Sequence, residues 1–533
     1  MSSGTASVAL SRPTTSVQIP KGGFGGSVSY TPPAVTIDPA LAQDFSVDEI
    51  QNLKDIEKEF GFTFSAAEKS YLAKHKFVTK NVLETNLRPI VRDTSREFAG
   101  LYDKIRGNPD IKERKPANAV FYTADVFFNT YAVLFVELLK EMENEVFFPS
   151  MKELSKQFYE GAAQHLAQAK TADEKATWTK VRNYFAVPHA ILSNAVEPPS
   201  KDAYITSDGT MQDPAKVMSD FKENDAKTDT EQTATAFVKT LKLDAASEAV
   251  VLADLKTIFA ATGKGAPKIF EQEYKDYEAL TTIAFKVDWS QFTPRSHYTS
   301  SSLRRQYFRA MNWYIQVPFF LKSPALTKYA FASTQLMAEH PEQLADYAQL
   351  EATIGFLVGT SDDLMPVDYL QALEANKGKS VQDAAVMDYL VKARNPKIKG
   401  LAATYPTIGD LQSADVLLAT KGMRFFSGKF IIDSYWTGYL TQGDEASRPG
   451  YPAKLPPMAS SLQVMTLLGS DYARTQIPKL DFYKPAVAGA IDKAMGDLEA
   501  ENNALGEAYW RESVYSSTLW VIQSLFGWQK AHK

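Results

Sequence analysis

The stretch from Arg295 to Phe319, "RSHYTSSSLRRQYFRAMNWYIQVPF", gathers many of the side chains that could do chemistry. It contains four arginines, one histidine, one tryptophan and three tyrosines. A guanidinium group can hold a carboxylate or a phosphate with two parallel hydrogen bonds. The functional interpretation is therefore an anion-binding surface, and the structural alternative is a helix packed into a core.

The serines and threonines at 299–302 are typical N-caps, so we expect a helix from about Ser302. Projected at about 100° per residue, its apolar residues form one arc and Arg305 and Arg309 lie on the opposite, solvated side. Arg304 falls inside the apolar arc, where an unpaired charge would be costly. We therefore expect Arg304 to meet an acid of the chain, the commoner arrangement, or an anionic ligand. Trp313 borders the two faces, and His297 precedes the helix.

A second polar cluster lies in "GTSDDLMPVDYLQAL", which begins at Gly359. Asp362, Asp363 and Asp368 supply oxygen ligands of the kind that Ca²⁺ prefers, but without the spacing of the twelve-residue calcium loop. The alternative, which we favour, is two successive helix starts, with Pro366 in the first turn of the second helix.

Other motifs exclude several enzyme classes. The histidines never stand four residues apart, so a zinc protease site on one helix is absent. The chain has no cysteine, and it shows no nucleophile elbow, phosphate loop or dinucleotide fingerprint. Asp433 and Glu507 each lie beside Trp and Tyr residues, and a facing pair of such carboxylates is what a glycan hydrolase would need.

Composition indicates a large globular protein. The chain has 533 residues, of which 44% are hydrophobic and 23% charged, and its net charge is −5. This balance gives no electrostatic footprint for nucleic acid. No run of 18 apolar residues occurs, so we expect no membrane span.

Hydrophobic residues recur mostly at helical spacing, which predicts a mainly α fold with few short strands. We expect a flexible Ser/Thr/Gly/Pro-rich tether at 1–45, helical subdomains at 46–196 and 233–533, and a polar linker or loop at 197–232. The tether is either the stalk of an exported protein or an ordinary N-terminal tail.

Five segments, in order, resemble the domain of unknown function 3160 family: "KFVTKN", "NAVFYTADVFFNTYAVLFVELLKEME", "KVDWSQFTPRSHYTSSSLRRQYFRAMNWYIQVPF", "FLVGTSDDLMPVDY" and "LPPMASSLQVMTLLGSDYA". The resemblance covers roughly residues 60 to 528. Members of that family look like exported proteins, often lipoproteins, with no assigned activity. The resemblance therefore implies an extracytoplasmic or cell-surface location, with attachment to a membrane through the N-terminus.

Three departures from the family pattern matter. Asn129 and Ala132 stand where histidines are usual, and Ser296 replaces a glycine before His297. If the family histidines bind metal, we expect this chain to have lost that site. The family usually continues beyond "FGWQKAHK" with a segment rich in His, Glu and Asp, so a second chain or a separate C-terminal piece is an expected partner.

We therefore expect an extracytoplasmic helical protein that acts by binding or as part of a surface assembly. Its expected ligand surface comprises His297, Arg304, Arg309, Trp313, Asp362 and Asp363. No cofactor is expected, apart from the Ca²⁺ alternative at Asp362, Asp363 and Asp368. The competing hypothesis is a peptide or glycan hydrolase that uses paired carboxylates.

Overall fold

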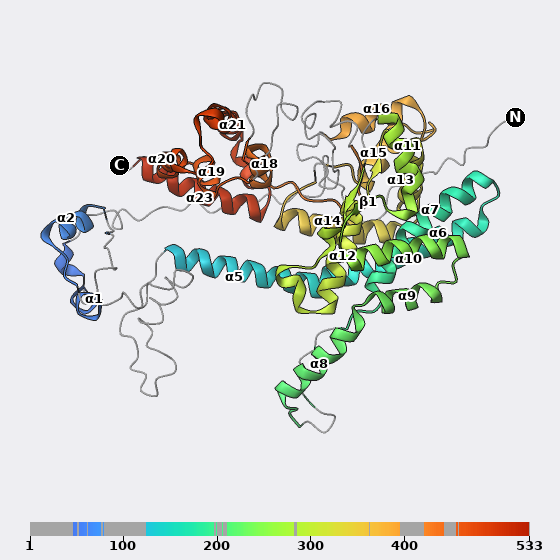
Figure 1. The fold of residues 1–533 in the computed structure, drawn as a ribbon, viewed down its shortest axis with the longest axis horizontal. Coiled ribbons are helices and arrows are strands. Elements are labelled where there is room, and N and C mark those ends of the chain that lie inside the picture. The colour runs from blue at the N-terminus through green and yellow to red at the C-terminus, as the bar shows by residue number, and fades with distance from the viewer. Residues whose placement is uncertain are drawn as a thin grey trace. The chain divides into compact units, whose positions relative to one another are not determined.

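The computed structural model describes residues 46–50, 53–60, 62–75, 78, 124–196, 199, 205, 210–281, 285–361, 363–394, 421–441, 455–456 and 458–531. The mainly α prediction is confirmed, because helices dominate these ranges and the strands that they contain are only two residues long (Figure 1). Among the described residues, no helix combines the length and the apolar character that crossing a bilayer requires. The predicted tether at 1–45 lies outside these residues.

Contacts divide the described residues into two compact units, with the border between Glu137 and Leu138. The first unit contains a 3₁₀ turn, two short helices and the first part of a longer helix: Val47–Glu49, α1 (Leu53–Phe60), α2 (Ala66–His75) and α5 (Ala124–Met142). The linker predicted at 197–232 does not lie at this border. Helices from both sides of that segment pack together within the second unit. The segment itself contains the whole of helix α8 (Pro214–Thr228).

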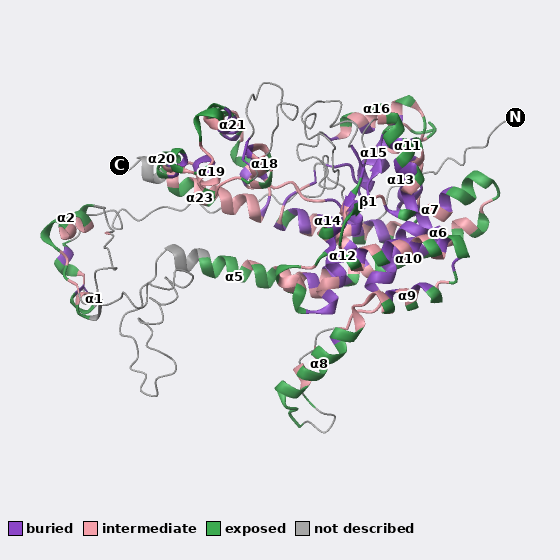
Figure 2. Cartoon of the chain, in the orientation of Figure 1, coloured by how far each residue is buried: buried purple, intermediate pink, exposed green. Residues whose placement is uncertain are grey.

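The second unit is built around a helical hairpin of α6 (Phe148–Gln168) and α7 (Ala172–Leu192). Thr171 and Glu174 form a capping box at the start of α7. Around the hairpin pack α9 (Glu231–Thr240), α10 (Ala245–Ala260), α12 (Ser302–Gln316), α13 (Pro324–Glu339) and α14 (Pro341–Leu357). Most residues of α7, α12 and α13 are buried, whereas α8 is largely exposed (Figure 2).

Beside this core lie α11 (Glu271–Thr281), α15 (Pro366–Ala375) and α16 (Ala384–Ala393). The short strands pair antiparallel: β1 (Lys264–Gly265) with β2 (Val287–Asp288), and β3 (Phe319–Phe320) with β4 (Gly422–Met423). Gly422 is required here, because a Cβ at this position would lie 2.5 Å from the carbonyl oxygen of Phe319.

The C-terminal helices form a second hydrophobic cluster around Trp436, Ile491 and Leu498. These helices are α18 (Ile432–Leu440), α19 (Ser461–Leu467), α20 (Asp471–Gln476), α21 (Pro485–Ala504), α22 (Glu507–Trp510) and α23 (Val514–Ala531). The helical stretch that starts after Lys484 is not one continuous helix. It breaks at Leu505, whose backbone is extended, and the chain starts a new helix beyond Ser513, which caps the backbone of Ser516.

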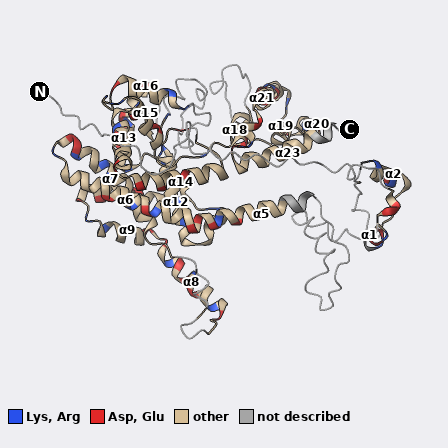
Figure 3. Cartoon of the chain, turned by 180° about the vertical axis from the view of Figure 1, so that it is seen from behind, with Lys and Arg blue, Asp and Glu red and all other residues tan. Residues whose placement is uncertain are grey.

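Charged residues of both signs are interspersed over the described helices, in keeping with the small net charge of the chain (Figure 3). Many of these residues form exposed pairs one helical turn apart, such as Lys392 with Asp388 at 2.7 Å. Such pairs contribute little to stability, so the buried pairs described below matter more.

Candidate functional site

The predicted ligand surface does not assemble around one site. Arg309 donates to both oxygens of Asp229, at 2.6 and 2.7 Å, and lies over the ring of Phe259. Arg305 also binds Asp229, at 2.7 Å, and reaches Asp225 at 3.0 Å. The solvated face expected for Arg305 and Arg309 is therefore wrong, because α8 and the residue that follows it supply the acids that cover this face.

Arg304, expected in the apolar arc, is half-buried, and its guanidinium donates to the hydroxyl of Ser300 at 2.7 Å. Trp313 is fully buried, and its indole N–H donates to the carbonyl oxygen of Tyr184 at 3.1 Å. Both side chains therefore have partners within the chain, and Trp313 offers no surface to a ligand.

His297 and Tyr298 converge on one buried carboxylate, Glu143. The His297 Nε2 atom lies 2.9 Å from this carboxylate, and the Tyr298 hydroxyl donates to it at 2.7 Å. Burial raises the pKa of Glu143, partly offset by the hydrogen bond from Tyr298 and by the charge of His297. Glu143 opens the π-helical segment Glu143–Phe147 between α5 and α6. The cluster joins this segment to the 3₁₀ turn Ser296–Ser300.

Asp433 and Glu507, the carboxylates considered for a glycan hydrolase, each have another partner in the structure. Asp433 accepts a hydrogen bond from Tyr515 at 2.7 Å. Glu507 is exposed and forms an ion pair with Arg511 at 2.9 Å, one helical turn away. The partner of Asp433 is distant in the chain, whereas that of Glu507 lies on the next turn.

A hollow along one face of α13 offers space for a ligand. Two adjoining cavities, of about 540 and 210 Å³, share Lys328, Phe331 and Val381 in their walls. We call this feature the α13 groove. Its floor runs from Pro324 to Ala338, which corresponds to about 20 Å of helix.

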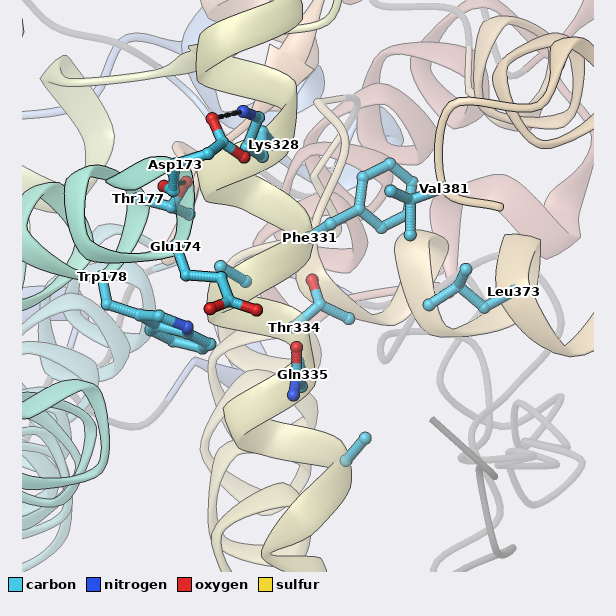
Figure 4. A pocket seen from close by; sticks show the side chains of 12 residues that line it. Asp173, Glu174, Thr177, Trp178, Lys328, Phe331, Thr334, Gln335, Leu373 and Val381 are labelled. Carbon is cyan, nitrogen blue, oxygen red and sulfur yellow. Dashed lines mark hydrogen bonds and ion pairs between the residues drawn. The ribbon is translucent and has the colours of Figure 1, made fainter. Parts of the chain in front are cut away.

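Different elements form the two walls of the α13 groove. The first turns of α7 contribute Asp173, Glu174 and Trp178 beside the smaller cavity. The helices α15 and α16 and the loop between them contribute Leu373 and Val381 there and, beside the larger cavity, Val381, Met387 and Val391. Figure 4 shows the side chains of α7 and those of Leu373 and Val381 on opposite sides of α13, with Phe331 and Val381 pointing toward each other.

Most of the surface that lines the α13 groove is apolar, although polar and charged residues also contribute to it. The ammonium group of Lys328 lies 2.6 Å from a carboxylate oxygen of Asp173, as the dashed line in Figure 4 marks. Lys322 lines the larger cavity and is exposed. Hydrogen bonds from the backbone N–H groups of Thr171 and Lys170 lower the pKa of Glu174, so its carboxyl is ionised at neutral pH.

Sequence comparison places the chain in a family. A family model described as "Protein of unknown function (DUF3160)" matches residues 65–533. The chain belongs to the DUF3160 family. The family resemblance read from the sequence is therefore confirmed. Searches of curated proteins and of solved structures returned no match.

In this DUF3160 chain, the acidic family segment forms part of the core. Asp363 pairs with Arg424 at 2.7 Å, and Asp368 pairs with Arg394 at 2.8 Å. Asp368 also accepts a hydrogen bond from the backbone N–H of Met365 at the start of α15, where Pro366 occupies the first turn as the helix-start interpretation predicts. Asp362 lies outside the described residues. No group of three or more potential metal ligands occurs within the described part of the chain.

Two of the departures from the family pattern lie within the described residues. Asn129 and Ala132, which replace histidines, lie exposed on α5. Ser296, which replaces a glycine, has a φ of 55°, the left-handed conformation that glycine adopts without strain. The usual glycine at this position therefore has a conformational reason.

Sequence reasoning missed the α13 groove. Its floor residues repeat at intervals of three and four, which is also the pattern of a helix face that packs against a neighbour. Only the placement of α7 and α16 leaves this face open, and no local signal in "SPALTKYAFASTQLMAEH" reports that placement.

Proposed function

We propose that this DUF3160 chain is a binding protein and that the α13 groove takes an apolar ligand of small-molecule size. The observation that carries this proposal is the cavity of about 540 Å³ with a mainly apolar lining. Ligand sites in proteins are typically clefts of about 300–1,000 Å³, lined by apolar side chains with a few polar groups. An extracytoplasmic location and a role in a surface assembly stay predictions from the family resemblance.

Binding is favoured over hydrolysis by what lines the groove. Its acids are Asp173, which pairs with Lys328, and Glu174, which caps the start of α7. Both acids therefore already have structural partners, and neither faces a second carboxylate across the apolar wall. The groove thus supplies shape and apolar contact, which favour binding, without the acid and base pair that hydrolysis would need.

The proposal is tested with N-phenyl-1-naphthylamine, a neutral apolar compound whose fluorescence rises on transfer from water. We expect saturable binding to the full chain. Val381 lines both cavities, so Val381→Trp fills the space where they meet and lowers the affinity by about tenfold or more. Met387→Trp, which fills only the larger cavity, provides a second variant.

The matched control is Val521→Trp, because Val521 is exposed on α23 and lines neither cavity. It adds the same tryptophan without closing the groove and leaves the affinity unchanged. Circular dichroism checks that all three variants fold. If folded Val381→Trp and Met387→Trp proteins bind the probe as well as the control does, the groove is not the site and the proposal fails.

A further inference from the structure

The charges of the α13 groove differ between its two cavities, and this difference bears on the chemistry of the ligand proposed above. Lys322 lines only the larger cavity, whereas Asp173 and Glu174 line only the smaller one. Lys328 lines both. The larger cavity therefore carries positive charge and the smaller one negative charge, although both share one apolar floor.

Helix α13 adds to this difference. It begins at Pro324, which lines the larger cavity, and Ser323 caps it by accepting from the backbone N–H of Leu326. The N-terminus of a helix carries a partial positive charge that stabilises a nearby anion. This charge acts at the same cavity as the Lys322 ammonium group, so helix and side chain favour the same sign of ligand charge.

From this combination we infer that the ligand is an apolar carboxylate. Its acid group lies near Lys322 and Lys328, and its hydrocarbon body lies against Phe331, Met387 and Val391. The inference rests on the proposed function, since it concerns the same cavity. It adds that the groove distinguishes a carboxylate from an alcohol or an amine with the same hydrocarbon chain.

The inference also predicts that Asp173 weakens the binding of a carboxylate ligand. The Asp173 carboxylate holds the Lys328 ammonium group at 2.6 Å and therefore competes with a ligand carboxylate for it. The side chain of Lys328 is 32% exposed, so its ammonium group keeps contact with solvent when Asp173 is removed. Replacing Asp173 by a neutral residue should therefore strengthen the binding of a carboxylate, whereas replacing Lys322 should weaken it.

The experiment uses dodecanoate, dodecan-1-ol and dodecylamine as competitors of the bound naphthylamine probe, below their micelle concentrations. For the unmodified chain we expect dodecanoate to bind more tightly than dodecylamine by about tenfold. Lys322→Met should weaken dodecanoate by about fivefold and leave dodecan-1-ol unchanged. Asp173→Asn should strengthen dodecanoate by about twofold to fivefold, again without effect on dodecan-1-ol.

The control is Lys222→Met, because Lys222 is an exposed lysine on α8 that lines neither cavity. It removes one positive charge and should change none of the three affinities. If the probe binds but the three competitors displace it equally, or if Lys322→Met behaves like Lys222→Met, the inference is overturned while the proposed function stands. If neither the probe nor any competitor binds, the proposed function itself has failed.

Discussion

Asp229 holds two arginines of α12, and its removal should destabilise that helix strongly. Its side chain is 2% exposed, and it accepts from Arg309 at 2.6 and 2.7 Å and from Arg305 at 2.7 Å. In Asp229→Ala, Arg309 keeps only its contact with the ring of Phe259, whereas Arg305 keeps Asp225 and the carbonyl oxygen of Thr299. The uncompensated charge of Arg309 therefore dominates the cost.

Breaking a buried ion pair by removing one partner costs about 3–5 kcal/mol. Because the chain contains two units, its unfolding need not be two-state, so local hydrogen exchange is a better assay than a global midpoint. The amides of α12 should exchange faster by about a hundredfold or more in Asp229→Ala. Asp388→Ala is the control, because it breaks an exposed pair with Lys392 that is worth about 0.3–0.5 kcal/mol.

A second substitution separates the effect of the unpaired charge from that of lost packing. Arg309→Met in the Asp229→Ala background removes the uncompensated guanidinium and should restore part of the protection of α12. The reasoning is refuted if Asp229→Ala alters the exchange of α12 no more than Asp388→Ala does. It is equally refuted if Arg309→Met adds its full separate cost.

Two other predictions concern stability. Gly422→Ala would place a methyl group 2.5 Å from the carbonyl oxygen of Phe319 and should cost about 1–3 kcal/mol, whereas Gly489→Ala on α21, with open space around it, should stabilise by about 0.5–1 kcal/mol. Thermal midpoints that move in the same direction would contradict this. Burial, together with Lys156 and Lys152 nearby, lowers the pKa of His189 to about 4 from the 6.5 of the unfolded chain. The unfolded chain thus binds the proton more readily, and stability should fall as pH falls from 6.5 to 4. His189→Phe should flatten this slope in urea unfolding, and an unchanged slope would exclude His189 as its source.

Local signals in the sequence predicted where a helix starts better than they predicted which residues pack against it. The start of α12 near Ser302 follows from its serine caps, and Ser301 does cap it. The projection nevertheless placed Arg305 and Arg309 on a solvated face, which is wrong because α12 is covered on more than one side. One of the helices that cover α12 is α8. It lies about 80 residues earlier in the chain, in a segment that the sequence predicts to be a polar linker. A helical projection carries no information about such a partner.

The acidic segment that begins at Gly359 shows the same limit. Its helix-start interpretation predicts two helix starts, and the structure confirms the second, with Pro366 in the first turn of α15. Residues 363–365 are not helical, so the first start is not found there. The partners of Asp363 and Asp368 are Arg424 and Arg394, which lie well outside that segment. Helix caps are local, so the sequence reveals them, whereas buried ion pairs join distant residues that only the tertiary fold identifies.

The pairing of β3 with β4 has a consequence for how the protein is made. Phe319 pairs with Met423 and Phe320 with Gly422, so the partners lie about 100 residues apart in the chain. A ribosome that adds about 5–20 residues per second therefore exposes these two apolar side chains for about 5–20 s before their partners emerge. During that interval the nascent chain carries an unpaired strand in front of α13, and a chaperone that holds extended apolar segments would find its target there.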